Sequence, residues 1–180
     1  MIFEPPLIGD TLTREVLRAT RAAVHDLTQA GDGEEYCGYA LYSDADAMTV
    51  CFAANTRAHL ARMRTTDPDD AEYYVWTPAE WALEGIGHEH FDALCRKSAA
   101  SSATGGATER ERRREAVYEA CVTALESLVE EGVFGAAGSR VVVFAVSDVA
   151  DPVREVEWIR RLNPPSRSRD VWEDAVVSRS

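Results

Sequence analysis

The chain has 180 residues, of which 31 are acidic and 19 are Lys or Arg, giving a formal net charge of -12. This length suits one domain, and a composition with 46% hydrophobic and 28% charged residues is typical of a globular rather than a disordered protein. The excess of acid argues against a protein that binds nucleic acid or an anionic membrane surface, because both need Lys and Arg to neutralise phosphate.

The sequence also lacks the features of export and membrane insertion. Its start has neither the basic residues nor the apolar run of a secretory signal, and no stretch approaches the roughly 20 apolar residues of a membrane span. Cys37, Cys51, Cys95 and Cys121 lie too far apart for the paired spacing of zinc or redox sites. We therefore expect free thiols, a cytoplasmic location, and neither a metal nor a cofactor.

The first third of the chain predicts a helix followed by a β-hairpin. Apolar residues recur at helical spacing over 11–29. The segments 36–42 and 48–53 are rich in aromatic and β-branched residues, and the short polar stretch between them favours an antiparallel hairpin. A short helix is expected over 56–64, where an Asn-Thr pair is available as a cap.

The middle of the chain predicts a third strand and two further helices. The aromatic residues of 72–76 favour a strand. After it, Thr77 can cap a helix, Pro78 suits the first helical position, and Glu80 can complete a capping box. We expect this helix to break at the next glycines and another to cover 88–97.

The last part of the chain predicts a loop, two helices, a strand and a tail. Small residues over 98–107 favour a mobile loop, and an apolar stripe over 109–130 favours a long helix. The continuous apolar run of 140–146 predicts a strand at the centre of the sheet, covered on both faces. A final helix is expected over 152–162, and 166–180 resembles a C-terminal tail.

These elements together predict the class of fold. A helix, a hairpin, further helices and a late buried strand favour a single α+β domain over 1–165. We expect about four strands in a largely antiparallel sheet, with helices packed on it.

The most distinctive string is Trp-Thr-Pro-Ala-Glu-Trp over 76–81. Helix capping accounts for its Thr, Pro and Glu, and its two tryptophans suit anchors of a core. The string lies in the stretch 65–95, which has eight acidic residues and no Lys or Arg. We take this stretch as the candidate functional surface, with an ordinary solvated helix face as the alternative. The candidate residues are Trp76, Glu80, Trp81, Glu84, His88 and Asp92.

Two patterns resemble metal sites. His88 and Asp92 are four residues apart and would share one helix face, but His90 points elsewhere and no third ligand is identifiable. The acid-rich segments 44–46 and 67–70 lack the Gly and the closing Glu of a calcium loop, and turn formation explains them better. The sequence therefore predicts no metal site.

The chain contains an ordered set of short motifs. They are an Asn-Thr pair after the second strand, the Trp-Thr-Pro-Ala-Glu-Trp string, Gly-Val-Phe-Gly over 132–135, and a Trp followed by Arg-Leu-Asn-Pro over 161–164. From about Thr11 to Pro164 this set resembles the bacterial family DUF4303, a domain of unknown function. The resemblance implies a single bacterial cytoplasmic α+β domain and transfers no catalytic residue. The family-motif residues are Asn55, Thr56, Thr77, Pro78, Phe134, Gly135, Trp158, Leu162, Asn163 and Pro164.

Two hypotheses of function follow from these observations. Small acidic families of this kind often lie near polymorphic-toxin loci, so an immunity-type or regulatory protein is the leading one. It would be non-enzymatic, and its acidic face would hold a basic protein partner such as a nuclease toxin. The alternative is a small hydrolase or transferase that uses Glu80, His88 and Asp92 near the Trp76–Trp81 turn. A housekeeping interaction domain is a third interpretation.

Overall fold

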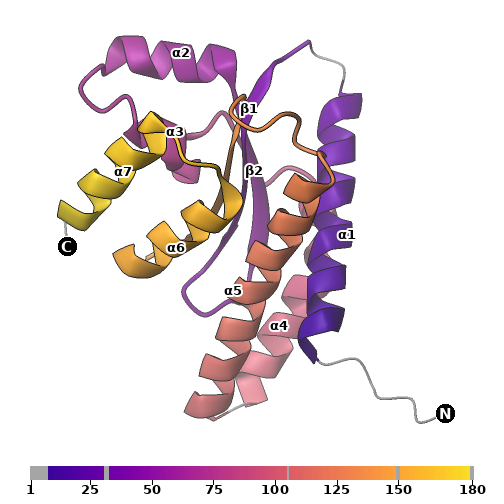
Figure 1. Cartoon of the computed structure of the whole chain (residues 1–180). Helices are drawn as coiled ribbons and strands as arrows, with labels where there is room; N and C mark the ends of the chain where they lie inside the picture. Colours follow the sequence, from indigo (N-terminus) through magenta and orange to yellow (C-terminus); the bar gives the residue numbers. More distant parts are fainter. Residues whose placement is uncertain (1–7, 31–32, 105, 149–150, 179–180) are drawn as a thin grey trace.

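The computed structural model describes residues 8–30, 33–104, 106–148 and 151–178, and it places a four-stranded sheet between two helical layers (Figure 1). The described α-helices are α1 (Ile8–Gln29), α2 (Arg57–Thr66), α3 (Tyr73–Trp76), α4 (Asp92–Thr104), α5 (Ala107–Glu130), α6 (Pro152–Leu162) and α7 (Arg167–Ser178). The strands are β1 (Tyr36–Ser43), β2 (Val50–Thr56), β3 (Leu83–Glu84) and β4 (Val141–Val146). Two 3-10 helices are η1 (Pro78–Glu80) and η2 (His88–His90).

The sheet is mixed, with the strand order β3-β2-β1-β4. β1 and β2 form the expected antiparallel hairpin, and β2 pairs with β3 antiparallel. β1 and β4 run parallel, with Tyr39 opposite Val142. The prediction of a four-stranded α+β domain is therefore confirmed, with the correction that the sheet is not strictly antiparallel.

The strand β4 lies at the edge of the sheet, so the prediction of a central strand is wrong. Val142 and Phe144 are buried in the core on one face, and Val143 is buried in the core on the other. A continuous apolar run indicates that both faces of a strand are covered, and helices cover both faces here even though β4 has a strand on only one side.

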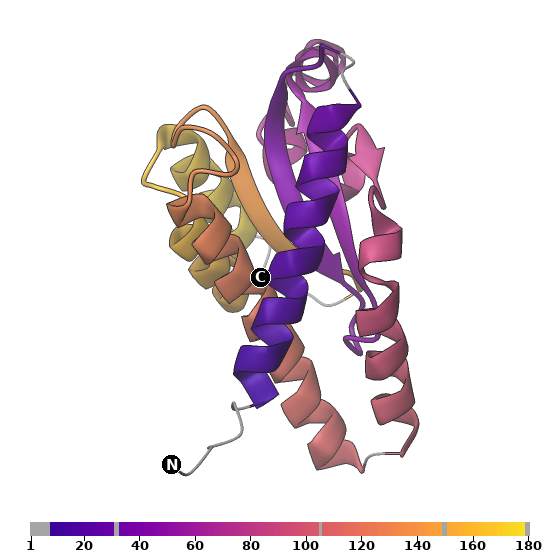
Figure 2. The same ribbon diagram turned by 90° about the vertical axis from the view of Figure 1, so that its right-hand side faces the viewer.

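Each face of the sheet has its own core. On one face, α1 and α5 pack on each other and over Leu41 and Phe52 (Figure 2 shows α1 in front). On the other face, Trp81 and Ile159 pack over strand residues that include Ala53. The small side chain of Ala53, which is fully buried, leaves room for these larger groups above the sheet.

The outer edge of β4 is held by the side chain of Asn163, which follows α6. Its Oδ1 accepts the Val142 N–H at 2.8 Å, and its Nδ2 donates to the Val142 carbonyl at 2.6 Å. Nδ2 also donates to the carbonyl of Ile159 at 3.1 Å. One buried amide thus satisfies both backbone groups that Val142 turns away from β1, as a neighbouring strand would.

The segment that follows α2 is helical where a strand was expected. The Tyr73 N–H donates to the carbonyl of Asp70 at 3.0 Å and begins the short helix α3. α3 buries Val75 and Trp76 in the second core. Aromatic residues favour strands because they pack well on a sheet, but here they pack from a helix laid over the sheet.

The predicted helix after Thr77 is also wrong. The Thr77 side chain makes no capping bond, and the chain completes only the single turn of η1. It then extends into β3, where Leu83 lies opposite Ala54. The single turn thus forms without the expected side-chain cap, and pairing with the edge of β2 determined the rest.

The segment 98–107 differs from the expected loop. α4 continues to Thr104 and α5 begins at Ala107, while Gly105 lies outside the described residues. Alanine is the best helix former, and this favours a continuing helix in a stretch that looks of low complexity. α4 and α5 form a helical hairpin that extends beyond the end of the sheet (Figure 2).

The segment 166–180, expected as a tail, contains α7. The Trp172 ring lies 5.9 Å from the ring of Trp76, and Glu173 is buried against arginines of α6 and α7. Residues 179–180 lie outside the described part of the chain, as do residues 1–7, on which the expectation about a signal peptide rests. Among the described helices, none is both long enough and apolar enough to cross a membrane.

Replacing the amide that holds β4 tests this account of the fold. Asn163→Ala leaves the Val142 N–H and C=O without partners, at about 1–3 kcal/mol for each buried group. We expect the free energy of unfolding, measured by urea denaturation, to fall by about 2–4 kcal/mol. The exposed neighbour Pro165→Ala is the control, with an expected change below about 1 kcal/mol. A loss below 1 kcal/mol for Asn163→Ala would contradict the proposed role.

Candidate functional site

The two tryptophans of the candidate surface are core residues. Trp76 is 3% exposed and Trp81 is 7% exposed, and both belong to the second core. The Trp81 ring lies directly over β1, where a Cβ atom at Gly38 would come within 3.0 Å of the ring. Trp76 Nε1 donates to the Ser168 hydroxyl at 3.1 Å, which joins α3 to α7. Neither indole ring is free to contact a partner.

Glu80 and Glu84 accept hydrogen bonds from tyrosines. The Tyr73 hydroxyl lies 3.5 Å from Glu80 Oε1, and the Tyr42 hydroxyl donates to Glu84 Oε1 at 2.8 Å. Burial and the bond to Glu84 raise the pKa of Tyr42, so this phenol stays protonated and donates. Neither carboxylate forms an ion pair with a described cation.

His88 and Asp92 have separate partners. His88 is mostly exposed and lies 3.5 Å from Glu89, while Asp92 lies 4.0 Å from Arg96 on the next turn of α4. In the described residues, no hydrogen bond or ion pair joins these two side chains to each other or to Glu80. The structure therefore does not assemble the three residues of the enzymatic alternative through direct contacts.

Another cluster brings three potential metal ligands together. Asp26, Glu89 and His90 place one ligand atom each within 4.8 Å of the others, and the His90 ring nitrogen lies 2.6 Å from the Asp26 carboxylate. Gly87 makes this approach possible, because a Cβ there would lie 2.8 Å from Cβ of Ala23 on α1. The sequence could not indicate this cluster, since Asp26 belongs to α1. The contact between His90 and Asp26 fastens η2 to α1.

Most acids of α5 have a cationic partner, whereas most acids of the stretch 65–95 have none among the described residues. In the C-terminal half, Arg161 Nη2 lies 2.8 Å from Glu119 and 2.7 Å from Glu126, and other acids are paired in the same way. In the stretch 65–95, only three of the eight carboxylates lie within 4.0 Å of an Arg or His side chain among the described residues. The five without one are Asp67, Asp69, Asp70, Glu80 and Glu84.

Some of these unpaired acids surround a pair of tyrosines. The rings of Tyr73 and Tyr74 lie 5.5 Å apart at 75°, and the Tyr74 hydroxyl donates to Asp67 at 3.3 Å. Partial desolvation, followed by the charge and hydrogen bond of Asp67 and the charges of Glu80 and Asp70, raises the pKa of Tyr74. Tyr73 is 37% exposed. We call Asp67, Asp70, Tyr73, Tyr74 and Glu80 the acidic patch.

A cavity of about 230 Å³ lies where β2 ends and β4 begins, beside α2, α3 and the start of α7. Arg57, Arg64 and Arg140 line it, together with Trp76, and none of its described lining residues is acidic. We call it the arginine cavity. The sequence did not indicate it, because the three arginines come from α2 and from the loop before β4, far apart in the chain. Its other lining residues include Cys37, Asn163, Ser166 and Ser168.

In the loop between β1 and β2, an aspartate side chain binds the backbone of the turn, as expected. Asp44 accepts the N–H groups of Asp46 at 2.9 Å, Met48 at 3.2 Å and Thr49 at 2.6 Å. Burial opposes ionisation of Asp44, but these bonds and the Thr49 hydroxyl outweigh it and lower the pKa of the carboxyl. The carboxylate oxygens are thus used by the turn, as predicted.

The sequence model of one family, Domain of unknown function (DUF4303), matches residues 16–164. The chain belongs to the DUF4303 family. No curated protein and no solved structure matches it.

Several DUF4303-motif residues identified in the sequence serve the fold of this member. Thr56 Oγ1 accepts the His59 N–H at 3.1 Å and caps α2, and buried Asn55 accepts the Ala82 N–H at 3.4 Å. The Trp158 ring lies 4.8 Å from Phe144 in the first core. Leu162 and Phe134 are buried in the same core.

A small substitution tests whether the Trp81 ring is a fixed part of the core. Gly38→Ala would place a methyl group against this ring and against Asn55 Cβ at 3.1 Å. We expect a loss of about 1–3 kcal/mol in urea denaturation, because the two strands and the ring cannot all move aside. Gly106→Ala is the control, since nothing lies within 4 Å of its Cβ position. Equal free energies of unfolding for the two variants would show that the Trp81 ring shifts to make room for the methyl group.

The hairpin loop predicts a pH-dependent stability. The folded-state pKa of Asp44 is lowered, so its carboxylate stabilises the fold above the ordinary carboxyl pKa of 3.8 and loses this effect as the pH falls through the folded pKa. We expect Asp44→Asn to be less stable than the wild type at pH 6, with a difference that narrows at pH 2.5. Urea denaturation at the two pH values measures the difference in the free energy of unfolding. A difference that stays constant would contradict the prediction.

Proposed function

We propose that this DUF4303 protein is a non-enzymatic binding protein that holds a basic protein partner at the acidic patch. The observation that carries the proposal is the tyrosine pair, with Tyr73 exposed and Tyr74 partly buried, whose hydroxyls meet Glu80 and Asp67. Neither carboxylate has a cationic partner among the described residues. Tyrosine is enriched in the energetically important part of interfaces, and its ring also attracts Lys and Arg side chains. The same patch therefore offers a partner both contact area and charge.

The charges of the patch suit rapid and selective capture of a basic surface. Unpaired surface carboxylates attract a cationic partner over a distance of about 8–10 Å at physiological salt, and they repel acidic proteins. A protein that binds nucleic acid is basic because it must neutralise phosphate groups, so a nuclease toxin has the charge that complements the patch. An immunity-type or regulatory role is thus the form of the proposal that the patch supports best.

The proposal includes a bacterial cytoplasmic location. Cys37, Cys51, Cys95 and Cys121 are all free thiols. Free thiols persist in a reducing compartment, whereas exported proteins commonly pair them.

Capture from a lysate of the native host tests the patch. We expect the immobilised protein to retain one basic protein at low salt and to release most of it at high salt, since surface charge interactions are screened. The variant Asp67→Asn/Asp70→Asn/Glu80→Gln should retain at least about tenfold less, because the patch loses three charges. Mass spectrometry identifies the retained protein, and titration of the purified pair gives the Kd.

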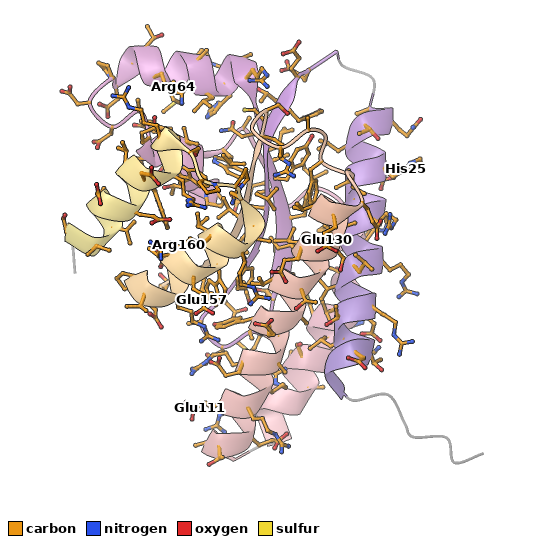
Figure 3. All side chains as sticks on the ribbon, in the orientation of Figure 1. His25, Arg64, Glu111, Glu130, Glu157 and Arg160 are labelled. Atoms are coloured by element: carbon orange, nitrogen blue, oxygen red, sulfur yellow. The ribbon has the colours of Figure 1, made fainter. Side chains whose placement is uncertain are left out.

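A matched variant separates the patch from overall charge. Glu130→Gln/Glu157→Gln/Asp174→Asn removes the same charge from exposed positions on α5, α6 and α7 (Figure 3 labels Glu130 and Glu157). It should retain the partner as well as the wild type does. Equal loss in both variants would show a general charge effect, and equal retention would exclude the patch as the binding surface.

A further inference from the structure

The arginine cavity has a charge opposite to that of the whole protein. The chain carries a net charge of -12, yet three arginines and no carboxylate line this cavity. The cavity lies at the end of the molecule where α2, α3 and α7 meet (Figure 1), and Figure 3 labels Arg64 on α2. A cluster of like charges costs stability unless something of opposite sign is placed among them. Arg57 and Arg64 each approach one carboxylate, Glu35 and Glu72. Arg140 has no ion pair among the described residues, so it is the cation that points to a bound anion.

Arg140 is the most informative of the three. It is 6% exposed, and among the described residues its Nε and Nη1 are buried without a hydrogen-bond acceptor. Burial lowers the pKa of Arg140, because loss of water disfavours its charged form. Buried charges in proteins are nearly always paired, because an unpaired one costs several kcal/mol.

The other two arginines have donors to spare. Arg57 Nη2 donates to the carbonyl of Ser139 at 2.8 Å, and Arg57 Nε lies 3.3 Å from Glu35. Within the described part of the chain, Arg64 has one distant ion pair, 3.9 Å from Glu72. A guanidinium carries five N–H donors, so these few contacts leave several for a ligand.

A further element adds positive potential on the same side. The Ser166 hydroxyl accepts the Arg169 N–H at 3.2 Å and caps the start of α7, and both Ser166 and Ser168 line the cavity. The N-terminus of a helix carries a partial positive charge and presents free N–H groups to an anion. The Ser166 hydroxyl can also donate, whereas the Ser168 hydroxyl already donates to Glu72.

We propose that the arginine cavity binds a phosphate group, supplied by inorganic phosphate or by a small phosphate monoester. The volume of about 230 Å³ is smaller than the roughly 300–1,000 Å³ of sites that enclose a whole drug-sized ligand, and suits a single head group. Guanidinium groups bind both carboxylate and phosphate in bidentate fashion. Three of them beside a helix N-terminus favour the oxyanion with more than one negative charge.

Calorimetric titration at constant ionic strength tests this proposal. The probes are inorganic phosphate, glycerol 3-phosphate, acetate and succinate. We expect both phosphates to bind, with acetate and succinate at least about tenfold weaker. Tighter binding of glycerol 3-phosphate identifies a monoester as the source, and tighter binding of inorganic phosphate identifies the free ion. Binding of no phosphate, or equal affinity for succinate, would overturn the proposal.

Variants connect the binding to the cavity. Arg64→Gln and Arg140→Gln should each raise the Kd for phosphate about tenfold, the effect of losing one charged hydrogen bond. Arg112→Gln, at an exposed position on α5 outside the cavity, removes the same charge and should leave the Kd unchanged. Arg64 is 46% exposed, so its variant provides the test even if Arg140→Gln does not fold. An unchanged Kd in Arg64→Gln would place the phosphate elsewhere.

Discussion

The outer strand of the sheet depends on one buried side-chain amide. Asn163 completes the hydrogen bonds of Val142 and, through its N–H to the Ile159 carbonyl, also ends α6. Because β4 has a strand on only one side, this residue replaces the missing neighbour and fixes α6 against the edge. Both cores meet β4, and Asn163 also lines the arginine cavity. The same residue, Asn163, therefore holds the outer strand and forms part of the cavity wall.

Periodicity and capping located most of the helices and the three longer strands, because those signals are local. α6 illustrates this: Asp151 Oδ1 accepts the Arg154 N–H at 3.2 Å, and Pro152 begins the helix as expected. The errors lie where tertiary packing decided the outcome. α3 is a helix because its aromatic residues cover the sheet, and β3 extends because the edge of β2 was available. The position of β4 was not predictable, since burial of both faces does not reveal the order of strands.

The candidate sites also divide into features that the local sequence reveals and features that only tertiary packing creates. The acidity of the stretch 65–95 was visible in the sequence, and so was the structural role of Trp76 and Trp81. The tyrosine pair was not, because its residues were assigned to a strand in which neighbours point to opposite faces. The arginine cavity was out of reach, since Arg64 and Arg140 come together only through the packing of α2 against the start of β4.

The parallel pairing of β1 with β4 has a consequence for how the chain acquires its structure. Between these partners lie β2, β3 and the helices from α2 to α5, so their pairing closes a long loop, a step that is slow because of its entropy. On the ribosome, β1, β2 and β3 emerge well before β4. Until β4 is synthesised, the backbone N–H and C=O groups on one side of β1 are unpaired and can pair with a strand of another chain. Synthesis of the last quarter of the chain therefore supplies the strand that covers the free edge of β1 and removes this risk of aggregation.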